Sequence, residues 1–354
     1  MARPAGRAVR QAGSDPGPQA LALGVVADAD GIAVAAMGGT RSGEAVRLVP
    51  GALLARGWSG EERAALAAGD AEPVETAAAT LVARLRADLP EAPALLGLAA
   101  AAPAMPDPAV LAEVAGLPVL WDFRSADQGL GGAGAPLAPP VWHGIARGLG
   151  WDAPFAVARL GRVCRLAGID PRAEDPRDAG VLAALDTGPG PGFCALPPPG
   201  RKARQAGPRR PVLDAALGAP FFARMPPRRL GAGDLPDLPA ALAALPPTQA
   251  GATLRALVAE GLAAALPLLP EAPARLILTG PGAADAGLVT RLRKRLALPV
   301  MTAAEAGLDP APDGAHLVAG LALRVAWGLA IGFPGTTGVA APVGGALVVR
   351  PGAG

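Results

Sequence analysis

The sequence predicts an α/β fold, and three observations support this prediction. The chain of 354 residues is 51% hydrophobic and only 18% charged, so it can build a sizeable core. Short apolar runs of strand length alternate with segments of helical spacing, as in α/β proteins. Each half of the chain also opens with a predicted hairpin, which indicates a duplicated architecture.

The first half opens with two apolar runs joined by a tight turn. Leu21–Val26 and Ile32–Met37 flank residues 28–31, whose Asp and Gly accept the unusual backbone angles of such a turn. The pattern then predicts a third strand at Val46–Val49 and a helix at Glu75–Arg86. A strand at Ala94–Leu98, a helix at Pro108–Val114 and a strand at Pro118–Trp121 follow. Asp107 and Gly116 are the expected ends of the second of these helices.

The pattern restarts after a Gly- and Pro-rich stretch at Gly129–Pro140. Phe155–Val157 and Val163–Leu166 predict a second hairpin, and Val181–Leu185 predicts the next strand. A helix is expected from Thr253 onward. The next elements are a strand at Arg275–Leu278 and a helix after it. A short strand at Val300 and a long helix at Leu317–Ile331 are the last.

The domain boundaries follow from this order of elements. We expect an N-terminal α/β lobe over residues 20–150 and a C-terminal α/β lobe over residues 151–354, whose final residues can return to the first lobe. Residues 1–19 are expected to form a disordered extension. An Arg-rich transit peptide is the alternative, whereas a secretory signal is excluded because this segment contains no apolar core.

The charge balance argues against two classes of partner. Lys and Arg together number 32 and Asp and Glu 30, so neither nucleic acid nor an anionic membrane is expected to bind. The longest apolar run, Leu317–Phe333, contains Arg324 and is predicted to be a buried helix rather than a membrane span. We therefore expect a soluble, cytoplasmic protein.

Disulfide and metal sites are not expected. Cys164 and Cys194 stand far apart in the sequence without a C-x-x-C partner. With His143 and His316 as the only histidines, a metal cluster is not supported. The basic segment Leu196–Pro211 is expected to be a solvated loop, with a phosphate-binding arm as the alternative.

Three glycine-containing turns follow predicted strands, at residues 28–31, 186–190 and 279–282. Most glycine turns only reverse the chain, but small residues also let a backbone approach phosphate closely, and a following helix N-terminus attracts an anion. Together the turns favour a nucleotide between two lobes, and we expect Asp30, Asp186 and Gly280 to line one cleft. The P-loop and protein-kinase signatures are absent, which excludes those two families.

The most distinctive stretch is Asp122–Asp127, which Gly131–Leu137 follows. An Arg between two Asp residues at a strand end can hold a polar ligand, because Arg donates hydrogen bonds and Asp accepts them. The same spacing also fits a structural Arg–Asp network that pins a loop.

This stretch, with His143 six residues after it, resembles the D-F-R-S-x-D…G-G-Q-G-A-P-L…H signature of bacterial anhydro-N-acetylmuramic acid kinases. Further motifs of that family follow in the same order, at Asp186–Gly190 (D-T-G-P-G-N), Phe221–Arg228 (F-F…P-P-K), Thr279–Ala283 ([T/C]-G-G-G-A) and Gly332–Gly338 (G-x-P…T-G). The resemblance covers most of the chain. It implies a two-lobed actin-like and hexokinase-type (ribonuclease H-like) ATPase fold.

The resemblance also implies an activity. A kinase of this family uses ATP and Mg²⁺ to open 1,6-anhydro-N-acetylmuramic acid hydrolytically and to phosphorylate O6, which yields N-acetylmuramic acid 6-phosphate in peptidoglycan recycling. The implied partners are the small anhydro amino sugar and ATP, and a homodimer is compatible with the family.

Site residues carry over from the family motifs position by position. Asp186 matches the general base that activates water for attack on the anomeric carbon; the alternative is that Asp186 only caps its turn. Sugar contacts are implied for Arg124, Asp127, Gly132 and His316. Nucleotide contacts are implied for Asp28, Asp30, Gly31, Gly161, Thr187, Gly188, Gly190, Gly280 and Gly282. No metal-ligating residue is implied.

The chain departs from the family pattern at several phosphate-binding positions. The turn before Asp30 is two residues shorter than the family's loop and lacks its Ser and Thr hydroxyls. The family's N-[IL]-G-G…N motif is Arg159–Arg162 followed by Arg165 here, which places cations where the backbone meets phosphate. Ala133 and Pro281 replace a Gln and a Gly. An impaired paralogue that binds sugar or protein, or a purely structural protein, therefore remains the alternative.

Overall fold

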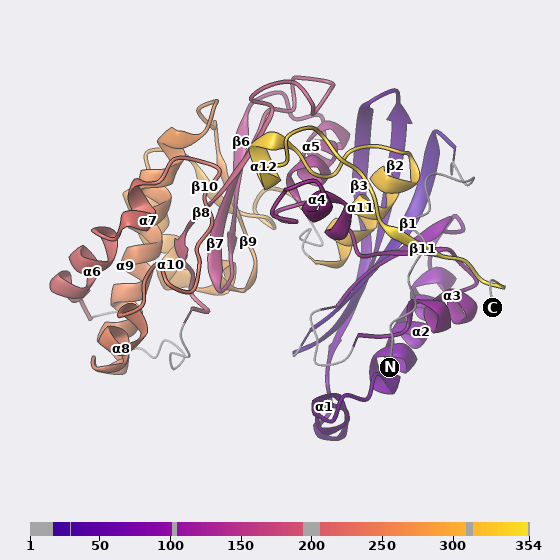
Figure 1. Cartoon of the computed structure of the whole chain (residues 1–354), viewed down its shortest axis with the longest axis horizontal. Coiled ribbons are helices and arrows are strands. Elements are labelled where there is room, and N and C mark those ends of the chain that lie inside the picture. The colour runs from indigo at the N-terminus through magenta and orange to yellow at the C-terminus, as the bar shows by residue number, and fades with distance from the viewer. Residues whose placement is uncertain (1–16, 29, 101–104, 194–205, 309–313, 353–354) are drawn as a thin grey trace. The chain divides into compact units, whose positions relative to one another are not determined.

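The computed structural model describes residues 17–28, 30–100, 105–193, 206–308 and 314–352 (Figure 1). The chain forms two compact units, each built on its own sheet. Unit 1 comprises Met1–Trp151, Glu174–Arg177 and Pro312–Gly354, and unit 2 comprises Asp152–Ala173 and Asp178–Ala311.

Unit 1 contains a six-stranded mixed sheet in the order β11-β5-β4-β1-β2-β3. Its strands are β1 (Gln19–Ala27), β2 (Gly31–Ser42), β3 (Ala45–Gly57), β4 (Leu95–Ala100), β5 (Val119–Trp121) and β11 (Leu347–Val349). The first three form an antiparallel meander, in which Val25 pairs with Val34. Strands β4 and β5 run parallel to β1, and β11 pairs antiparallel with β5.

Helices cover both faces of this sheet. The helices of unit 1 are α1 (Gly60–Ala67), α2 (Glu72–Ala87), α3 (Pro108–Ala115), α4 (Ser125–Gly129), α5 (Pro139–Gly148), α11 (Ala315–Ala326) and α12 (Pro334–Thr337). The side-by-side helices α2 and α3 share a core with Leu23 and Val25 of β1 (Figure 1). Because neighbouring residues of a strand point to opposite faces, Gly24 faces the other side, where α11 packs. A side chain at Gly24 would overlap the backbone of Ala315, so glycine permits this close packing.

Unit 2 repeats this plan with five strands in the order β10-β9-β6-β7-β8. They are β6 (Phe155–Leu160), β7 (Val163–Ile169), β8 (Leu182–Pro189), β9 (Leu276–Thr279) and β10 (Val300–Thr302). Again the first three form an antiparallel meander, while β9 runs parallel to β6 and β10 parallel to β9. The duplicated architecture predicted from the two hairpins is therefore confirmed, as is the α/β class.

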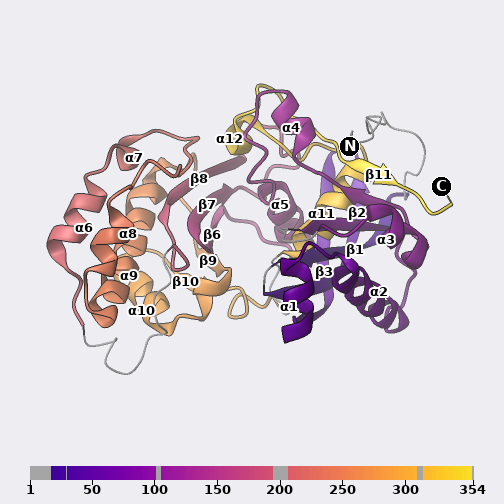
Figure 2. The ribbon, with the colours of Figure 1, turned by 60° about the horizontal axis from the view of Figure 1, so that its bottom comes forward.

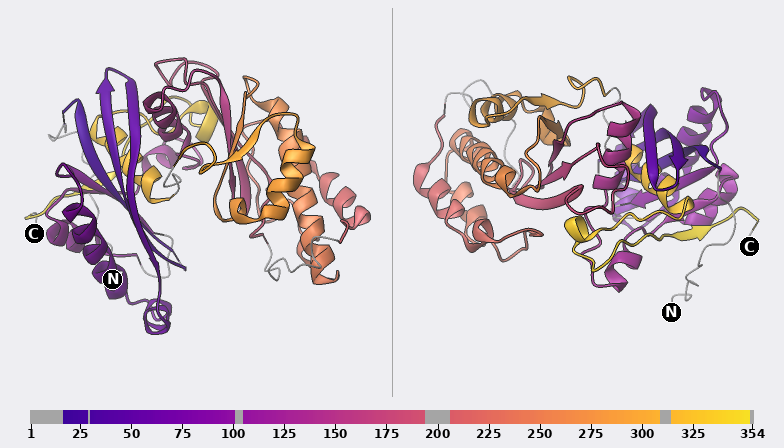
Figure 3. Two further views of the ribbon diagram at one scale, coloured as in Figure 1. Left: turned by 180° about the vertical axis from the view of Figure 1, so that it is seen from behind. Right: turned by 90° about the horizontal axis from the view of Figure 1, so that it is seen from above.

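The helices of unit 2 form two layers. They are α6 (Arg210–Leu217), α7 (Pro220–Ala223), α8 (Leu238–Ala243), α9 (Pro247–Ala265) and α10 (Ala286–Arg295), with short 3₁₀ turns η2 (Leu266–Leu268) and η3 (Pro281–Ala284). Helices α9 and α10 lie along the sheet and share its core (Figure 3). On the far side of α9, α6 and α8 contribute to a second core (Figure 2).

One helix of the described part is long and apolar enough to cross a membrane, namely Pro247–Leu268, which joins α9 and η2. More than half of its apolar window is buried, and it contributes to both cores of unit 2. A core helix passes the same test of length and composition, so the packing identifies this one as a core helix.

The predicted strands and helices are present, with differences at some ends. The expected long helix ends at Ala326 rather than at Ile331, because Gly328 adopts a left-handed conformation with φ 71°. The predicted buried helix of the Leu317–Phe333 run is confirmed over this shorter span. Most of the expected extension, residues 1–16, lies outside the described residues, while Gln19 already belongs to β1. Residues 196–205 of the basic segment also lie outside them.

Candidate functional site

In each unit, several of the predicted site residues follow the carboxyl ends of parallel strands. Residues 28–31 follow β1 and residues 122–127 follow β5, and both strands run parallel to β4 between them. In unit 2, Gly161 follows β6 and Gly280 follows the parallel strand β9. This edge of an α/β sheet is where ligands usually bind.

The β1–β2 turn is held by its own first residue. Asp28 Oδ1 accepts hydrogen bonds from the backbone N–H groups of Asp30 (2.9 Å) and Gly31 (3.1 Å). Trp58 donates its indole N–H to the Asp28 carbonyl at 2.8 Å. A side chain at Gly31 would overlap the Arg56 carbonyl, which explains the glycine. Asp30 is exposed at the tip of the turn.

The signature loop after β5 begins with a left-handed residue. Asp122 has φ 51° and accepts hydrogen bonds from the Ser125 backbone N–H (3.2 Å) and hydroxyl (2.6 Å). Within the described part of the chain, the exposed Arg124 guanidinium makes no ion pair with either Asp of the loop. The alternative of an Arg–Asp network is therefore wrong: the two Asp side chains pin the loop, and Arg124 remains accessible to a ligand.

Asp127 is the centre of a buried cluster in unit 1. Its side chain is 1% exposed and accepts hydrogen bonds from the Gly134 N–H (2.7 Å) and the Thr337 hydroxyl (2.5 Å). A side chain at Gly132 or Gly332 would overlap the Asp127 carboxylate. We call these five residues the Asp127 cluster. It joins the signature loop to the C-terminal helix α12 in one structure.

The predicted sugar-contacting His316 is also buried in unit 1. It lies in the first turn of α11, and its Nε2 is 2.9 Å from the Gly51 carbonyl oxygen of β3. His143 of the signature is buried in α5.

A row of polar side chains crosses the sheet of unit 2. Arg159 of β6 is in register with Thr279 of β9 on one side and with Arg165 of β7 on the other. Arg165 is in turn in register with Asp186 of β8. Directly opposed residues share a face of a sheet, so two cations and one carboxylate lie on the same face. We call these four residues the polar row.

Asp186 is held from several directions. Its Oδ1 accepts a hydrogen bond from Arg165 Nε at 3.2 Å, and its Oδ2 accepts one from the Leu230 backbone N–H at 2.9 Å. Arg228 donates its Nε–H to the Asp186 main-chain carbonyl at 3.0 Å. Among the described residues, the carboxylate accepts hydrogen bonds from Arg165 and Leu230 and from neither Thr187 nor Gly188, so the interpretation of Asp186 as the cap of its own turn is wrong.

A β-bulge shapes this part of β8. Cys164 pairs with Gly188 but Arg165 pairs with Asp186, which leaves Thr187 as the additional residue. Gly188 accommodates the distortion with φ 133°, and the buried Thr187 hydroxyl donates to the Cys164 carbonyl at 3.4 Å. Burial, together with the nearby Asp186 charge, raises the pKa of the Cys164 thiol, so this cysteine remains protonated.

Four predicted nucleotide-binding glycines gather at the end of β6. A side chain at Gly190 would overlap the Gly161 carbonyl, and one at Gly282 would lie 2.7 Å from Leu160 Cβ. Gly280 adopts a positive φ of 77°. The structure therefore brings Gly161, Gly190, Gly280 and Gly282 together, and contacts within the protein already require glycine at Gly190 and Gly282.

The helix after the third glycine turn does not offer a free N-terminus. Asp285 caps α10 by accepting hydrogen bonds from the N–H groups of Gly287 (2.9 Å) and Leu288 (3.1 Å). The same carboxylate pairs with Arg255 Nε at 2.7 Å. The expectation that this helix N-terminus attracts an anion is therefore wrong, because the chain's own carboxylate occupies it.

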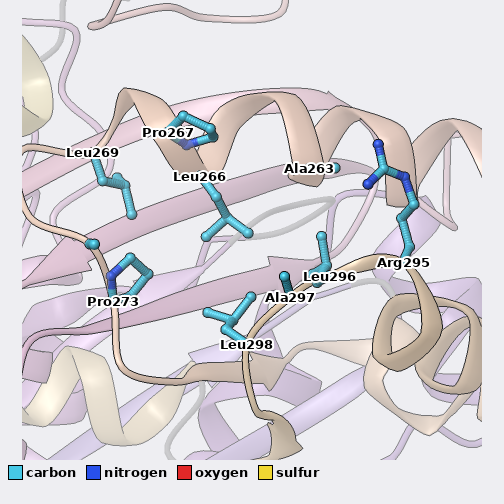
Figure 4. A pocket seen from close by; sticks show the side chains of 10 residues that line it. Ala263, Leu266, Pro267, Leu269, Pro273, Arg295, Leu296, Ala297 and Leu298 are labelled. Atoms are coloured by element: carbon cyan, nitrogen blue, oxygen red, sulfur yellow. The ribbon is translucent and has the colours of Figure 1, made fainter.

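An apolar pocket of about 410 Å³ lies elsewhere in unit 2 (Figure 4). It is lined by the end of α9, η2 and residues 295–298, with Arg295 at one end. Arg295 pairs with Glu260 at 2.8 Å. None of the site residues predicted from the sequence and described in the structure lines this pocket, so we assign it no part in the site.

The comparison with protein families decides the identity. A family model described as anhydro-N-acetylmuramic acid kinase matches residues 99–348, most of the chain. The protein belongs to this family. The match includes the signature loop, the polar row and α11, and it confirms the resemblance found in the motifs.

Individual relatives agree with the family match. The anhydro-N-acetylmuramic acid kinase of Ruegeria sp. (strain TM1040) is 36% identical over 255 residues, which cover 69% of this chain and 68% of the relative. The anhydro-N-acetylmuramic acid kinase 1 of Jannaschia sp. (strain CCS1) is 36% identical over 318 residues, or 84% and 82% of the two chains. Among solved structures, the inorganic polyphosphate/ATP-glucomannokinase of Arthrobacter sp. strain KM matches with a TM-score of 0.38 and 17% identity over 86% of this chain and 99% of that one.

The sequence alone did not indicate the roles of several residues around the family motifs. The motifs identify Arg165 only as a departure from the family, and Arg228 only as part of a motif. Leu230 and Thr337, which hold the two key carboxylates, had no assigned role. These two partners lie 44 and 210 residues away from the carboxylates that they contact, so only the fold reveals them.

Proposed function

We propose that this member of the anhydro-N-acetylmuramic acid kinase family is an active, cytoplasmic enzyme of peptidoglycan recycling. It opens 1,6-anhydro-N-acetylmuramic acid with water, phosphorylates O6 with ATP and releases N-acetylmuramic acid 6-phosphate and ADP. The observation that carries this proposal is the state of Asp186, a carboxylate fixed by two donors at the edge of the sheet where ligands bind.

The chemistry assigned to Asp186 is general base catalysis. Asp186 takes a proton from water, the water oxygen bonds to the anomeric carbon, and the bond between that carbon and O6 breaks. O6 then accepts the terminal phosphoryl group as the bond to the ADP oxygen breaks. A carboxylate has about four lone-pair sites, and Arg165 and Leu230 use only two, so Asp186 retains room for the water proton. A positioned base contributes about 10²–10⁴-fold to the rate.

The residues for the sugar lie in unit 1. Arg124 is exposed and offers a fork of donors, which suits a carboxylate or hydroxyl groups of a muramic acid. The buried Asp127 acts through the loop that it pins, and Gly132 leaves the space that the Asp127 carboxylate occupies. His316 is placed in the first turn of α11 by its contact to Gly51. We infer that these residues shape the sugar site.

The family motifs imply ATP-binding residues in each unit. In unit 2, Gly161, Thr187, Gly188, Gly190, Gly280 and Gly282 gather at one edge of the sheet, with the exposed cations Arg159 and Arg162 beside them. In unit 1, Asp28, Asp30 and Gly31 form the turn after β1. A backbone edge with two guanidinium groups fits the charge of a triphosphate.

Magnesium would neutralise the phosphate charge. Among the described residues, no group of three or more His, Cys, Asp or Glu side chains could hold a metal ion. A site made only of protein ligands is not required, because Mg²⁺ binds through substrate phosphates, water and one or two carboxylates. The exposed Asp28 and Asp30 side chains are carboxylates that can serve in this way.

The relatives described above are named kinases, which gives no support to an impaired paralogue.

The test is product formation by the purified protein. We expect ADP release that depends on 1,6-anhydro-N-acetylmuramic acid and Mg-ATP together, and a sugar product with the mass of N-acetylmuramic acid 6-phosphate. In ¹⁸O-labelled water, the label should appear at the anomeric hydroxyl and not in the phosphate. N-acetylmuramic acid without the anhydro bridge serves as the matched control. ADP release that does not depend on the anhydro sugar would contradict the proposal.

A further inference from the structure

The polar row contains an arginine whose contact points to a role in catalysis. Arg165 of β7 stands opposite Asp186 of β8 in register and donates its Nε–H to Oδ1. The Arg165 side chain is 41% exposed, whereas that of Asp186 is 3% exposed. The buried carboxylate therefore has a partner that solutes can reach.

We propose that Arg165 is a positioning residue, which fixes the orientation of the Asp186 carboxylate for proton abstraction. The inference rests on the proposed kinase activity and deepens it. Asp186 remains the group that meets the reacting water, and Arg165 acts only through Asp186.

The contacts around Asp186 divide between backbone and side chain. Arg228 holds the main chain through the Asp186 carbonyl, and Leu230 holds Oδ2 of the carboxylate. Arg165 is the donor to Oδ1. With one donor on each oxygen, the carboxylate cannot rotate without losing a hydrogen bond. Removal of Arg165 would leave Oδ1 without this donor and the buried charge without its cation.

The backbone supports the same role. The bulge at Thr187 shifts the register so that Arg165 opposes Asp186 directly, although Cys164 opposes Gly188. Bulges beside active sites commonly re-aim a side chain in this way. The pair is therefore built into the sheet and does not depend on a flexible loop.

The position also distinguishes this chain from its family. By the motif resemblance, the family has an Asn where this chain has Arg165, and a neutral amide cannot form an ion pair with Asp186. Arg159, the second cation of the polar row, is in register with Arg165 across β6 and β7. Arg165 is thus a feature of this chain that family motifs alone do not assign.

The test combines substitution with chemical rescue. We expect Arg165→Ala to lower kcat about 10²-fold, the cost of a misplaced catalytic group, with little change in the KM of either substrate. Guanidinium ion at non-denaturing concentration should restore part of kcat, because the Arg165 position is accessible. Arg165→Lys should retain more activity than Arg165→Ala, and Arg165→Asn should be impaired although it installs the family residue.

Arg172→Ala is the matched control. Arg172 lies in unit 2 and forms an exposed ion pair with Asp170 at 2.7 Å, so this variant should keep the wild-type kcat and show no response to guanidinium. Folding of each variant is checked by its melting temperature.

The outcomes separate the two proposals. If the wild type turns over and both Arg165→Ala and Arg165→Asn have the same kcat per folded molecule, the role of Arg165 is overturned but the proposed function is not. Loss of kcat in Arg165→Ala without any rescue by guanidinium would also overturn it. Wild-type protein without turnover would overturn the proposed function, and this inference with it.

Discussion

The Asp127 cluster gives a prediction for the stability of unit 1. Asp127→Ala removes the acceptor of two hydrogen bonds, from the Gly134 N–H and the Thr337 hydroxyl. A hydrogen bond to a charged group contributes about 1.5–3 kcal/mol, so the variant should lose about 3–6 kcal/mol. A domain has only about 5–15 kcal/mol in total, so we expect a large fraction of the stability of unit 1 to disappear.

Asp127→Asn refines the prediction. The Asn oxygen can still accept from Gly134, and its amide can donate to the Thr337 hydroxyl, so only the charge assistance is lost. We expect a loss of about 2 kcal/mol, clearly smaller than for alanine. Asp122→Asn is the matched control, because this more exposed carboxylate lies in the same loop and Asn tolerates the left-handed backbone. Its effect should stay below about 1 kcal/mol.

The assay is urea unfolding followed by tryptophan fluorescence. All five tryptophans of the chain, Trp58, Trp121, Trp142, Trp151 and Trp327, belong to unit 1, so the signal reports on that unit. A loss below about 1 kcal/mol for Asp127→Ala, or equal losses for the Ala and Asn variants, would refute the reasoning.

Three further predictions concern other parts of the fold. Gly190→Ala should prevent stable folding of unit 2 because its methyl group would overlap the chain, whereas Gly233→Ala, in open space, should melt like the wild type; equal melting curves would contradict this. Arg56 lowers the pKa of the Glu62 carboxyl to about 2, so the pair stabilises the protein above the ordinary carboxyl pKa of about 4.3, and this stability is lost as the pH falls toward 2. The melting temperature of the wild type should therefore exceed that of Glu62→Gln at pH 6, and this difference should shrink as the pH falls toward 2. A difference in melting temperature that does not change with pH would contradict the assignment. Burial lowers the pKa of Arg324 to about 10, and two of its nitrogens have no hydrogen-bond partner within the described residues. Because a buried charge without full pairing is costly, Arg324→Met should leave the free energy of unfolding unchanged or raise it, as urea unfolding would show; a clear loss would contradict this.

Local patterns predicted much of the fold because they act over a few residues. The structure begins α3 at Pro108 and ends it at Ala115, as Asp107 and Gly116 indicated. Asp107 accepts a hydrogen bond from the Ala109 N–H, and Gly116 is left-handed with φ 61°. Helix caps carry their own chemistry, so a single sequence reveals them.

Other elements could not be predicted from the local pattern. Helix α5 begins with Pro139 and Pro140, which end the Gly- and Pro-rich stretch of the sequence, because proline is well tolerated in the first turn of a helix. Strand β11 has three half-buried residues, Leu347–Val349, and owes its conformation to pairing with β5. The missed element was therefore defined by a partner that lies far away in the sequence.

The site divides in the same way. The motifs predicted Asp127 and Asp186 as important carboxylates, because their spacing within each motif is short. The sequence did not reveal that Thr337 and Leu230 hold them, since these contacts form only when distant segments pack. The roles of the glycine turns as nucleotide contacts remain predictions, as does the common cleft for Asp30, Asp186 and Gly280.

The most direct test of the account is the turnover of Asp186→Asn beside the wild type, with 1,6-anhydro-N-acetylmuramic acid and Mg-ATP. Asn keeps the size of Asp186 but cannot take the proton of the attacking water, so we expect turnover per folded molecule to fall about 10²–10⁴-fold. Asp170→Asn, which alters an exposed ion pair of unit 2, should keep wild-type turnover. An Asp186→Asn protein that melts earlier but turns over at the wild-type rate per folded molecule would contradict the account and leave Asp186 as part of the scaffold.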